Sequence, residues 1–255
     1  MKHIPYNSIG QFRDVVKNVQ HQARYIGKDV DGNARYNISA NMPTIKFTGT
    51  VKGHGCNSAV VLSPDGQMYV QSRSNIITPE KDNAGFAMFV ESKKDTFRIL
   101  LDEARIMSGV NNTHIVIFGE FAGGSIQKGV AVNQLPKMFI IFDIAVYVEG
   151  AEQEYTWFTK EEVMSLCCEN DIISQPRGSI PTSSEIYCIY DFPVQNIEID
   201  FDDPHDAINP MNKMTELVGD ECPIGKAFGV SGVGEGLVWK SHDHQHVFKV
   251  KDDRH

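Results

Sequence analysis

Three lysines in this chain stand where a nucleophile and an anion-binding pair could be formed: Lys52, Lys249 and Lys251. A lysine amine attacks an electrophile only as the free base. Its reference pKa is about 10.4, so desolvation or nearby positive charge must destabilise the ammonium form. Lys249 and Lys251 are two residues apart, so on a strand both side chains project from one face. Alone, such a pair is more typical of an exposed strand.

The residues around these lysines favour a nucleotide site. In Lys52-Gly53-His54-Gly55 the glycines would let the backbone approach a ligand without a Cβ in the way, although a turn serving only the fold is the alternative. Glu120 and Asp143 each lie in an apolar, β-branched run, where a purely structural strand rarely carries charge. Glu235 follows a glycine-rich stretch shortly before the paired lysines.

Taken in order, six segments of the chain resemble the motif series of the covalent nucleotidyltransferases, the superfamily of ATP-dependent ligases and mRNA capping enzymes. They span most of the chain and read Lys52-Gly53-His54-Gly55, Ser72-Arg73-Ser74, Phe118-Gly119-Glu120, Phe139-Ile140-Ile141-Phe142-Asp143, Glu235-Gly236-Leu237-Val238 and Lys249-Val250-Lys251. The first of them, extended to Asn57, reads Lys-x-His-Gly-x-Asn and is similar to the phage-type RNA ligase 2 family. DNA ligases and capping enzymes typically have Asp where this chain has His54.

The resemblance implies an ATP-dependent RNA ligase. Lys52 would attack the α-phosphate of ATP, release pyrophosphate and carry AMP, which would pass to an RNA 5′-phosphate before a 3′-hydroxyl displaces it. A divalent cation, Mg²⁺ or Mn²⁺, would neutralise phosphate charge. Two readings stay open beside this one: an mRNA capping guanylyltransferase that uses GTP, and a catalytically inactive relative that only binds nucleotide or nucleic acid.

The resemblance also implies roles for individual residues. Lys249 and Lys251 would hold the α-phosphate and discourage protonation of Lys52, with His54 among the catalytic residues. Glu120 would accept a hydrogen bond from a ribose hydroxyl, and Phe142, or its neighbour Phe139, would stack on adenine. RNA ligase 2 relatives often read adenine with a Glu directly before the nucleophile, which Val51 cannot replace. The remaining expected site residues are Thr50, whose backbone would help recognise the base, Asn57, Arg73 for phosphate, and Glu235 for metal, with Glu120 as a second metal candidate.

Composition sets broad limits. The chain has 255 residues and a net charge of -9, so nucleic acid must meet a local basic surface rather than the whole molecule. No apolar run of membrane-spanning length and no secretory signal are present, so a cytoplasmic location and no membrane partner are expected. The five scattered cysteines predict reduced thiols and no structural zinc. We also expect a monomer.

Local patterns predict one mainly antiparallel α+β domain over residues 1–255, with residues 1–40 as a helical segment packed on it. The resemblance implies the same, two-sheet, ATP-grasp-like architecture. It also implies that the C-terminal RNA-binding domain of relatives is absent, because the chain stops four residues after Lys251, so weak sealing of RNA ends is expected. The predicted helices are 8–25, 95–109, 160–168 and one capped by Asn209-Pro210; the predicted strands start at Thr44 and cover 58–62, 67–72, 114–120, 138–148, 186–190 and 197–201.

One further pattern could suggest a metal site. His242, His244 and His246 alternate and would share one face of a strand, as transition-metal ligands can. They lie in a short connection between two motifs and have no nearby cysteine. We therefore expect a solvated hairpin at this place.

Overall fold

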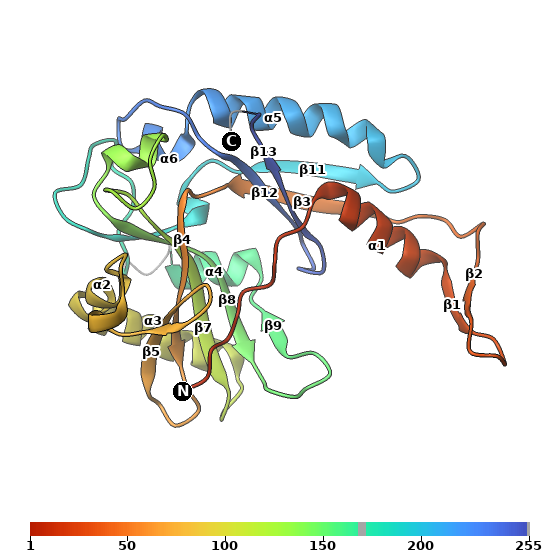
Figure 1. Cartoon of the computed structure of the whole chain (residues 1–255), viewed down its shortest axis with the longest axis horizontal. Coiled ribbons are helices and arrows are strands. Elements are labelled where there is room, and N and C mark those ends of the chain that lie inside the picture. Colours follow the sequence, from red (N-terminus) through yellow and green to blue (C-terminus); the bar gives the residue numbers. More distant parts are fainter. Residues whose placement is uncertain (168–171, 254–255) are drawn as a thin grey trace.

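Two β-sheets and a small hairpin make up the strands of the fold (Figure 1). The computed structural model describes residues 1–167 and 172–253. The larger sheet has the order β10-β8-β7-β4-β5-β6 with β9 paired to β8, the second sheet has the order β11-β3-β12-β13, and β1 pairs with β2. The strands are β1 (Tyr25–Lys28), β2 (Ala34–Tyr36), β3 (Thr44–Val51), β4 (Gly55–Leu62), β5 (Met68–Ser72), β6 (Ile76–Ile77), β7 (His114–Ala122), β8 (Met138–Tyr147), β9 (Tyr155–Trp157), β10 (Ile186–Cys188), β11 (Gln195–Asp200), β12 (Gly236–Ser241) and β13 (Val247–Lys251).

The predicted fold class is confirmed, since the pairs in both large sheets are antiparallel except β10 with β8, which run parallel. The predicted hairpin of β4 and β5 forms around Gly66, whose φ of 83° suits glycine. The strands β7 and β8 are buried on both faces, as their continuous apolar runs predict. Residues 189–190, predicted as strand, instead begin the 3₁₀ turn Ile189–Asp191.

Helices cover the outer faces of the two sheets. The helices α2 (Phe86–Ser92), α3 (Lys94–Ser108) and α4 (Lys160–Cys167) enclose one apolar core against the larger sheet. A second core joins the smaller sheet to α1 (Phe12–Arg24), α5 (Ile208–Asp220) and α6 (Pro223–Ala227). Short 3₁₀ turns occur at Pro79–Lys81, Ala131–Gln134 and Pro204–Ala207. The described residues include no helix that is long and apolar enough to cross a membrane.

The helix ends test the predicted caps. At α4, the Thr159 hydroxyl accepts from Glu162 N (3.2 Å), and the Glu162 carboxylate accepts from Thr159 N (2.7 Å), so the predicted capping box is confirmed. Its predicted end at Cys168 lies outside the described residues. The cap predicted at Asn209-Pro210 is wrong, because α5 follows directly from the 3₁₀ turn and already begins at Ile208, with Ala207 as its N-cap.

The first forty residues are only partly helical. Within them, α1 accounts for residues 12–24, and the hairpin of β1 and β2 follows it. Before α1, an extended segment crosses both sheets: Ile4 N donates to the Gln71 side chain, and Gly10 pairs with Phe248 of β13. Residues 1–11 therefore tie the larger sheet to the smaller one and run past the space between them (Figure 1).

Candidate active site

Lys52 and Glu235 meet because two strands of the smaller sheet pair side by side. β3 pairs antiparallel with β12 so that Val51 lies opposite Leu237, and Lys52 N donates to Gly236 O at 2.8 Å. This register brings Lys52 Nζ within 2.7 Å of Glu235 Oε2. The Glu235 side chain is only 4% exposed and that of Lys52 21%, so the ion pair lies at the bottom of a depression rather than on the surface.

Two more side chains share the Glu235 carboxylate. His54 Nδ1 lies 2.9 Å from Oε2, and Lys251 Nζ lies 2.7 Å from Oε1. Lys251 arrives through the pairing of β12 with β13, in which it stands opposite Gly236. Burial by itself would raise the pKa of Glu235, but the hydrogen bonds from Lys251, Lys52 and His54 outweigh it and lower this pKa to about 2. Glu235 is therefore a carboxylate at any pH near neutral.

Glu120 enters the site from the opposite sheet. It lies on β7 opposite Asn57 of β4, and its Oε1 accepts a hydrogen bond from Gly55 N at 2.8 Å. Burial raises its pKa to about 7, with Lys52 acting in the other direction. A Cβ at Gly53 would stand 2.8 Å from Glu120 Cγ, so glycine is required there for lack of space. Residues 52–55 thus contact two glutamates: Lys52 and His54 contact Glu235, whose pKa is lowered, and Gly55 N donates to Glu120, whose pKa is raised.

A pocket opens between these sheets and encloses about 610 Å³, including its solvent-open part. Six predicted site residues line it: Thr50, Val51, Lys52, Asn57, Glu120 and Phe142. Of the two candidate aromatic residues, Phe142 is at the pocket, whereas Phe139 is fully buried against Phe86 in the core behind the sheet. Alternation along β8 explains this, since Phe142 and Ile140 share the face that lines the pocket.

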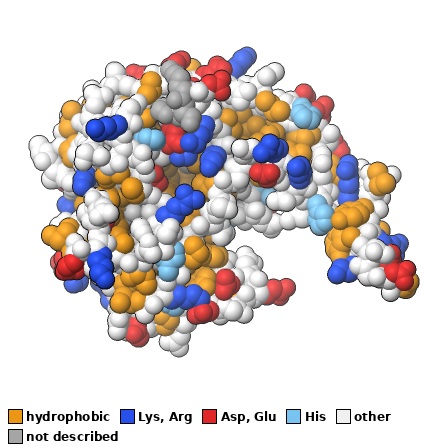
Figure 2. All heavy atoms as spheres, viewed as in Figure 1, with side chains coloured by type: hydrophobic (Ala, Val, Ile, Leu, Met, Phe, Trp, Pro, Cys, Tyr) orange, Lys and Arg blue, Asp and Glu red, His pale blue; other side chains and the backbone are white. Residues whose placement is uncertain are grey.

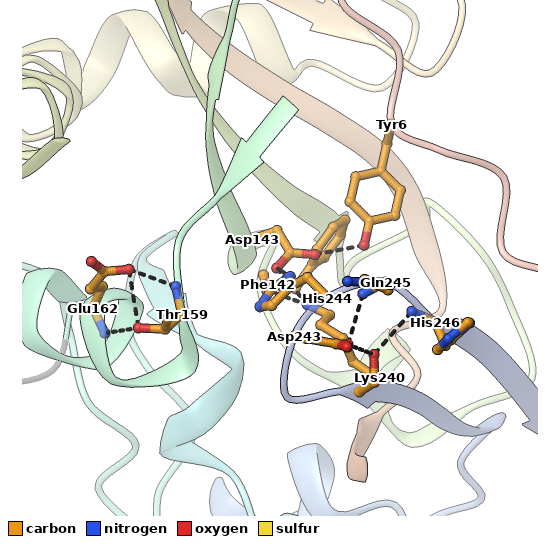
Figure 3. A network of polar contacts seen from close by, with 11 residues as sticks. Tyr6, Phe142, Asp143, Thr159, Glu162, Lys240, Asp243, His244, Gln245 and His246 are labelled. Carbon is orange, nitrogen blue, oxygen red and sulfur yellow. Dashed lines mark hydrogen bonds and ion pairs between the residues drawn. The ribbon is translucent and has the colours of Figure 1, made fainter. Parts of the chain in front are cut away.

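The pocket wall includes Tyr6 and Lys240, neither of which the sequence singled out. Tyr6 lies edge-on to Phe142 with ring centroids 5.1 Å apart, and its hydroxyl donates to Asp143 Oδ2 at 2.6 Å. Lys240 pairs with the other oxygen of the buried Asp143 (Figure 3). Tyr6 and Lys240 are remote in sequence from Asp143, and no local pattern marks either of them. The only sequence signal for this contact was Asp143 itself, because a charged residue in a buried strand requires a partner.

Three further residues predicted for the site, Arg73, Lys249 and Asn57, have no ion pair or hydrogen bond to Glu235 among the described contacts. Arg73 follows β5 and is exposed, but its charge is close enough to lower the pKa of Glu120. Lys249 lies half-buried on β13, and in the part of the chain that the structure describes it has no ion pair. Asn57 lines the pocket on β4. The structure therefore brings Lys251, and not Lys249, to the carboxylate.

The three alternating histidines do not share a face. They belong to the turn between β12 and β13, where His244 has a φ of 58° and stacks on Trp157 at 6.2 Å. His242 Nε2 contacts the Thr48 hydroxyl at 3.3 Å, and His246 is 6% exposed. The expectation of a solvated hairpin is wrong for His244 and His246, because the turn folds back onto the domain (Figure 3). Burial lowers the pKa of both.

A divalent cation would find few protein ligands here. Within residues 1–167 and 172–253, no three His, Cys, Asp or Glu side chains are grouped to hold a metal ion. Mg²⁺ in nucleotide sites usually has one or two carboxylates, with phosphate oxygens and water completing its shell. Glu235 fits such a role once Lys52 or Lys251 no longer binds a Glu235 oxygen. One oxygen of Glu120, by contrast, already accepts a hydrogen bond from Gly55 N.

Comparison with known proteins gives two results. A protein-family model described as RNA ligase matches residues 45–251. Structures of Naegleria gruberi RNA ligase are similar in fold: a lysine-to-methionine mutant with AMP and Mn (TM-score 0.57, 18% identity), a lysine-to-alanine mutant with ATP and Mn (0.57, 18%) and the enzyme with PPi (0.57, 17%). Each match covers 98% of this chain and 56–57% of the Naegleria chain, so this chain spans little more than half the length of those proteins.

Proposed function

This chain belongs to the RNA ligase family, and we propose that its residues 1–255 form the adenylyltransferase domain of an ATP-dependent RNA ligase. The observation that carries the proposal is the cluster in which Lys52, His54 and Lys251 surround the Glu235 carboxylate beside a pocket that Thr50, Glu120 and Phe142 line. Mutants of Naegleria gruberi RNA ligase have been observed with ATP and Mn or with AMP and Mn, which agrees with ATP as the nucleotide.

The first step would form a covalent enzyme intermediate. The Lys52 Nζ lone pair attacks the α-phosphorus of ATP, the bond from that phosphorus to the bridging oxygen of the β-phosphate breaks, and pyrophosphate leaves. The proton that Lys52 loses when the P–N bond forms passes to solvent or to the departing pyrophosphate. Glu235 would hold a divalent cation, Mg²⁺ or Mn²⁺, which would supply charge neutralisation for the transferred group.

The other residues would position the nucleotide. Phe142 provides the stacking face for the base, and Glu120 accepts from a ribose hydroxyl as a carboxylate. Lys251 holds the α-phosphate after it exchanges Glu235 for the ligand, and Arg73 meets the outer phosphates. Val51 leaves recognition of the base to other groups, among which Thr50 and Lys240 line the same pocket.

Two transfers to RNA would follow. An oxygen of an RNA 5′-phosphate attacks the phosphorus of Lys52-AMP, which frees the amine and leaves an RNA capped by AMP through a pyrophosphate bond. A 3′-hydroxyl then attacks the RNA 5′-phosphorus, AMP departs and a phosphodiester forms. Each step breaks one bond to phosphorus and makes another, so no oxidant or further energy source is needed.

Intact-protein mass spectrometry after incubation with Mg²⁺ and ATP, with GTP and NAD in parallel, tests the first step. We expect a gain of one AMP from ATP, absent in Lys52→Ala and retained in the control Lys46→Ala, an exposed lysine on the same strand. A GMP adduct from GTP would instead identify a guanylyltransferase. No adduct with any nucleotide would leave a binding protein and reject the proposal.

A further inference from the structure

The hairpin of β1 and β2 carries exposed aromatic side chains away from both large sheets. Tyr25 and Tyr36 are cross-strand partners, with ring centroids 6.0 Å apart, and they are 40% and 45% exposed. The His21 ring, from the end of α1, stacks on Tyr25 at 5.6 Å. An isolated two-stranded hairpin is marginally stable in water, so this contact with α1 helps to hold its shape.

Exposed apolar side chains gather on this hairpin. Fourteen large hydrophobic residues of the described chain are exposed, and five of them fall within residues 25–38: Tyr25, Ile26, Val30, Tyr36 and Ile38. Scattered exposed apolar residues need no explanation, but a concentration of them indicates a contact surface. Figure 2 shows hydrophobic side chains gathered on the projecting arm of the molecule, with Lys, Arg, His, Asp and Glu side chains beside them.

The segment made of α1 and the hairpin has a charge opposite to that of the whole chain, although the hairpin part, residues 25–38, is itself neutral, with two Lys or Arg and two Asp. Residues 12–38 contain five Lys or Arg and three Asp, a net charge of +2, so the other residues together carry -11 and the whole chain -9. Lys28 and Arg35 lie on the hairpin and have no acidic partner among the described residues. Asp29 is occupied within the turn, where it accepts from Asp31 N and Asn33 N. The cations are thus available to a polyanion.

The arm is connected to the pocket by short, ordered elements. Ile9 lines the pocket, Gly10 pairs with Phe248 of β13, and α1 begins at Phe12. The thirteen residues of α1 span about 20 Å. An RNA single strand with one end at Lys52 could therefore reach the hairpin within several nucleotides. The pocket beside Lys52 could not by itself hold that length of RNA.

We propose that this aromatic arm, defined as His21, Tyr25, Lys28, Arg35 and Tyr36, binds single-stranded RNA that flanks the end being joined. This inference rests on the proposed function for the identity of its ligand. Tyr25 and Tyr36 stack on unpaired bases, which present their faces only outside a duplex, and Lys28 and Arg35 meet phosphates. Together with α1, the arm belongs to a segment of net positive charge on an acidic protein.

Fluorescence anisotropy with a labelled, 5′-phosphorylated 20-nucleotide single-stranded RNA and no nucleotide tests the proposal, with a blunt RNA duplex as second probe. We expect Tyr25→Ala/Tyr36→Ala to weaken single-strand binding about fivefold or more, and duplex binding much less. Lys28→Glu/Arg35→Glu should also flatten the dependence of log affinity on log salt by about 0.7 for each phosphate that the variant no longer neutralises. Ile106→Ala and Lys213→Glu, exposed positions on α3 and α5, are the matched controls and should bind as wild type.

Two outcomes would overturn the arm as an RNA surface: arm variants that bind single-stranded RNA as the controls do, or a wild type that dimerises through the arm while the tyrosine variant is monomeric. Equal weakening for duplex and single strand would reject base stacking. Adduct formation from ATP is measured in the same variants. It should be unchanged, so a failure of the arm and a failure of the proposed chemistry give different results.

Discussion

Lys52 Nζ and Glu235 Oε2 lie 2.7 Å apart although 183 positions separate the two residues in the chain. At this distance the Lys52 amine donates a hydrogen bond to the carboxylate, so the proposed nucleophile is engaged in a contact within the protein. His54 Nδ1 and Lys251 Nζ also contact this carboxylate. In the proposed reaction, a bound nucleotide would have to replace Glu235 as the partner of Lys52 before Lys52 attacks.

Replacement of Glu235 by glutamine should slow adduct formation by about 10²-fold or more, in the range found when a group that stabilises transition-state charge is removed. The pKa of Glu235 is lowered from 4.5 to about 2, so its carboxylate stabilises the fold above pH 4.5, and this contribution is lost as pH falls toward 2. Glu235→Gln should thus lower the free energy of unfolding by up to about 3 kcal/mol at pH 7. Urea denaturation of the wild type and the variant at pH 7 and at pH 2–3 measures the free energies of unfolding. A difference between the two proteins that is equal at both pH values would contradict the lowered pKa of Glu235.

Glu120 should show the opposite dependence. Its pKa is raised from 4.5 to about 7, so the folded protein binds this proton more tightly than the unfolded chain, and stability falls as pH rises from 4.5 to 7. Glu120→Gln should stabilise the nucleotide-free protein by about 2–3 kcal/mol at pH 8 and have little effect at pH 4. The same variant should weaken ATP binding, because the ribose loses a charged acceptor. Calorimetric titration with ATP and denaturation across pH separate the two effects.

A methyl group at Gly53 should disturb nucleotide binding through Glu120. The added Cβ would come within 2.8 Å of Glu120 Cγ, so Gly53→Ala must displace that side chain. We expect an affinity for ATP about tenfold lower, because the loss of one hydrogen bond to a charged group costs about 1.5–3 kcal/mol. In a Glu120→Ala background the 2.8 Å contact with Cγ is absent and only the looser contact with Cβ, at 3.1 Å, remains. Gly53→Ala should then lower the free energy of unfolding by less than it does with Glu120 present. An equal loss in both backgrounds would place the strain elsewhere.

Lys240 should be needed to neutralise a buried charge beside the pocket. Asp143 is 1% exposed, and its other partners are the Tyr6 hydroxyl and, at 3.8 Å, His244. Lys240→Met would leave this carboxylate without its cation and should destabilise the protein by about 3 kcal/mol or more. Adding Asp143→Asn removes the unpaired charge and should recover much of the loss. Chemical denaturation of the wild type, both single variants and the double variant gives the coupling; additive effects would contradict the pairing.

The sequence by itself determined the features that depend on neighbours a few residues apart. The β4–β5 hairpin follows from Ser63-Pro64-Asp65-Gly66, the cap of α4 from Thr159 and Glu162, and the end of α3 from Gly109, whose φ is 64°. Alternation along a strand likewise puts Lys249 and Lys251 on one face. The order of the motifs indicated the family, because a series of residue types can be read without knowing where they meet.

Only the tertiary structure decided which of these residues act together. Alternation separates Phe139 from Phe142 on β8 but does not say which face is covered by helices and which lines the pocket. The shared carboxylate of Glu235 depends on how β3, β12 and β13 pair, and the place of Tyr6 depends on a segment that crosses both sheets. Strand pairing and side-chain packing join residues that are remote in sequence, and local propensities carry no record of those contacts.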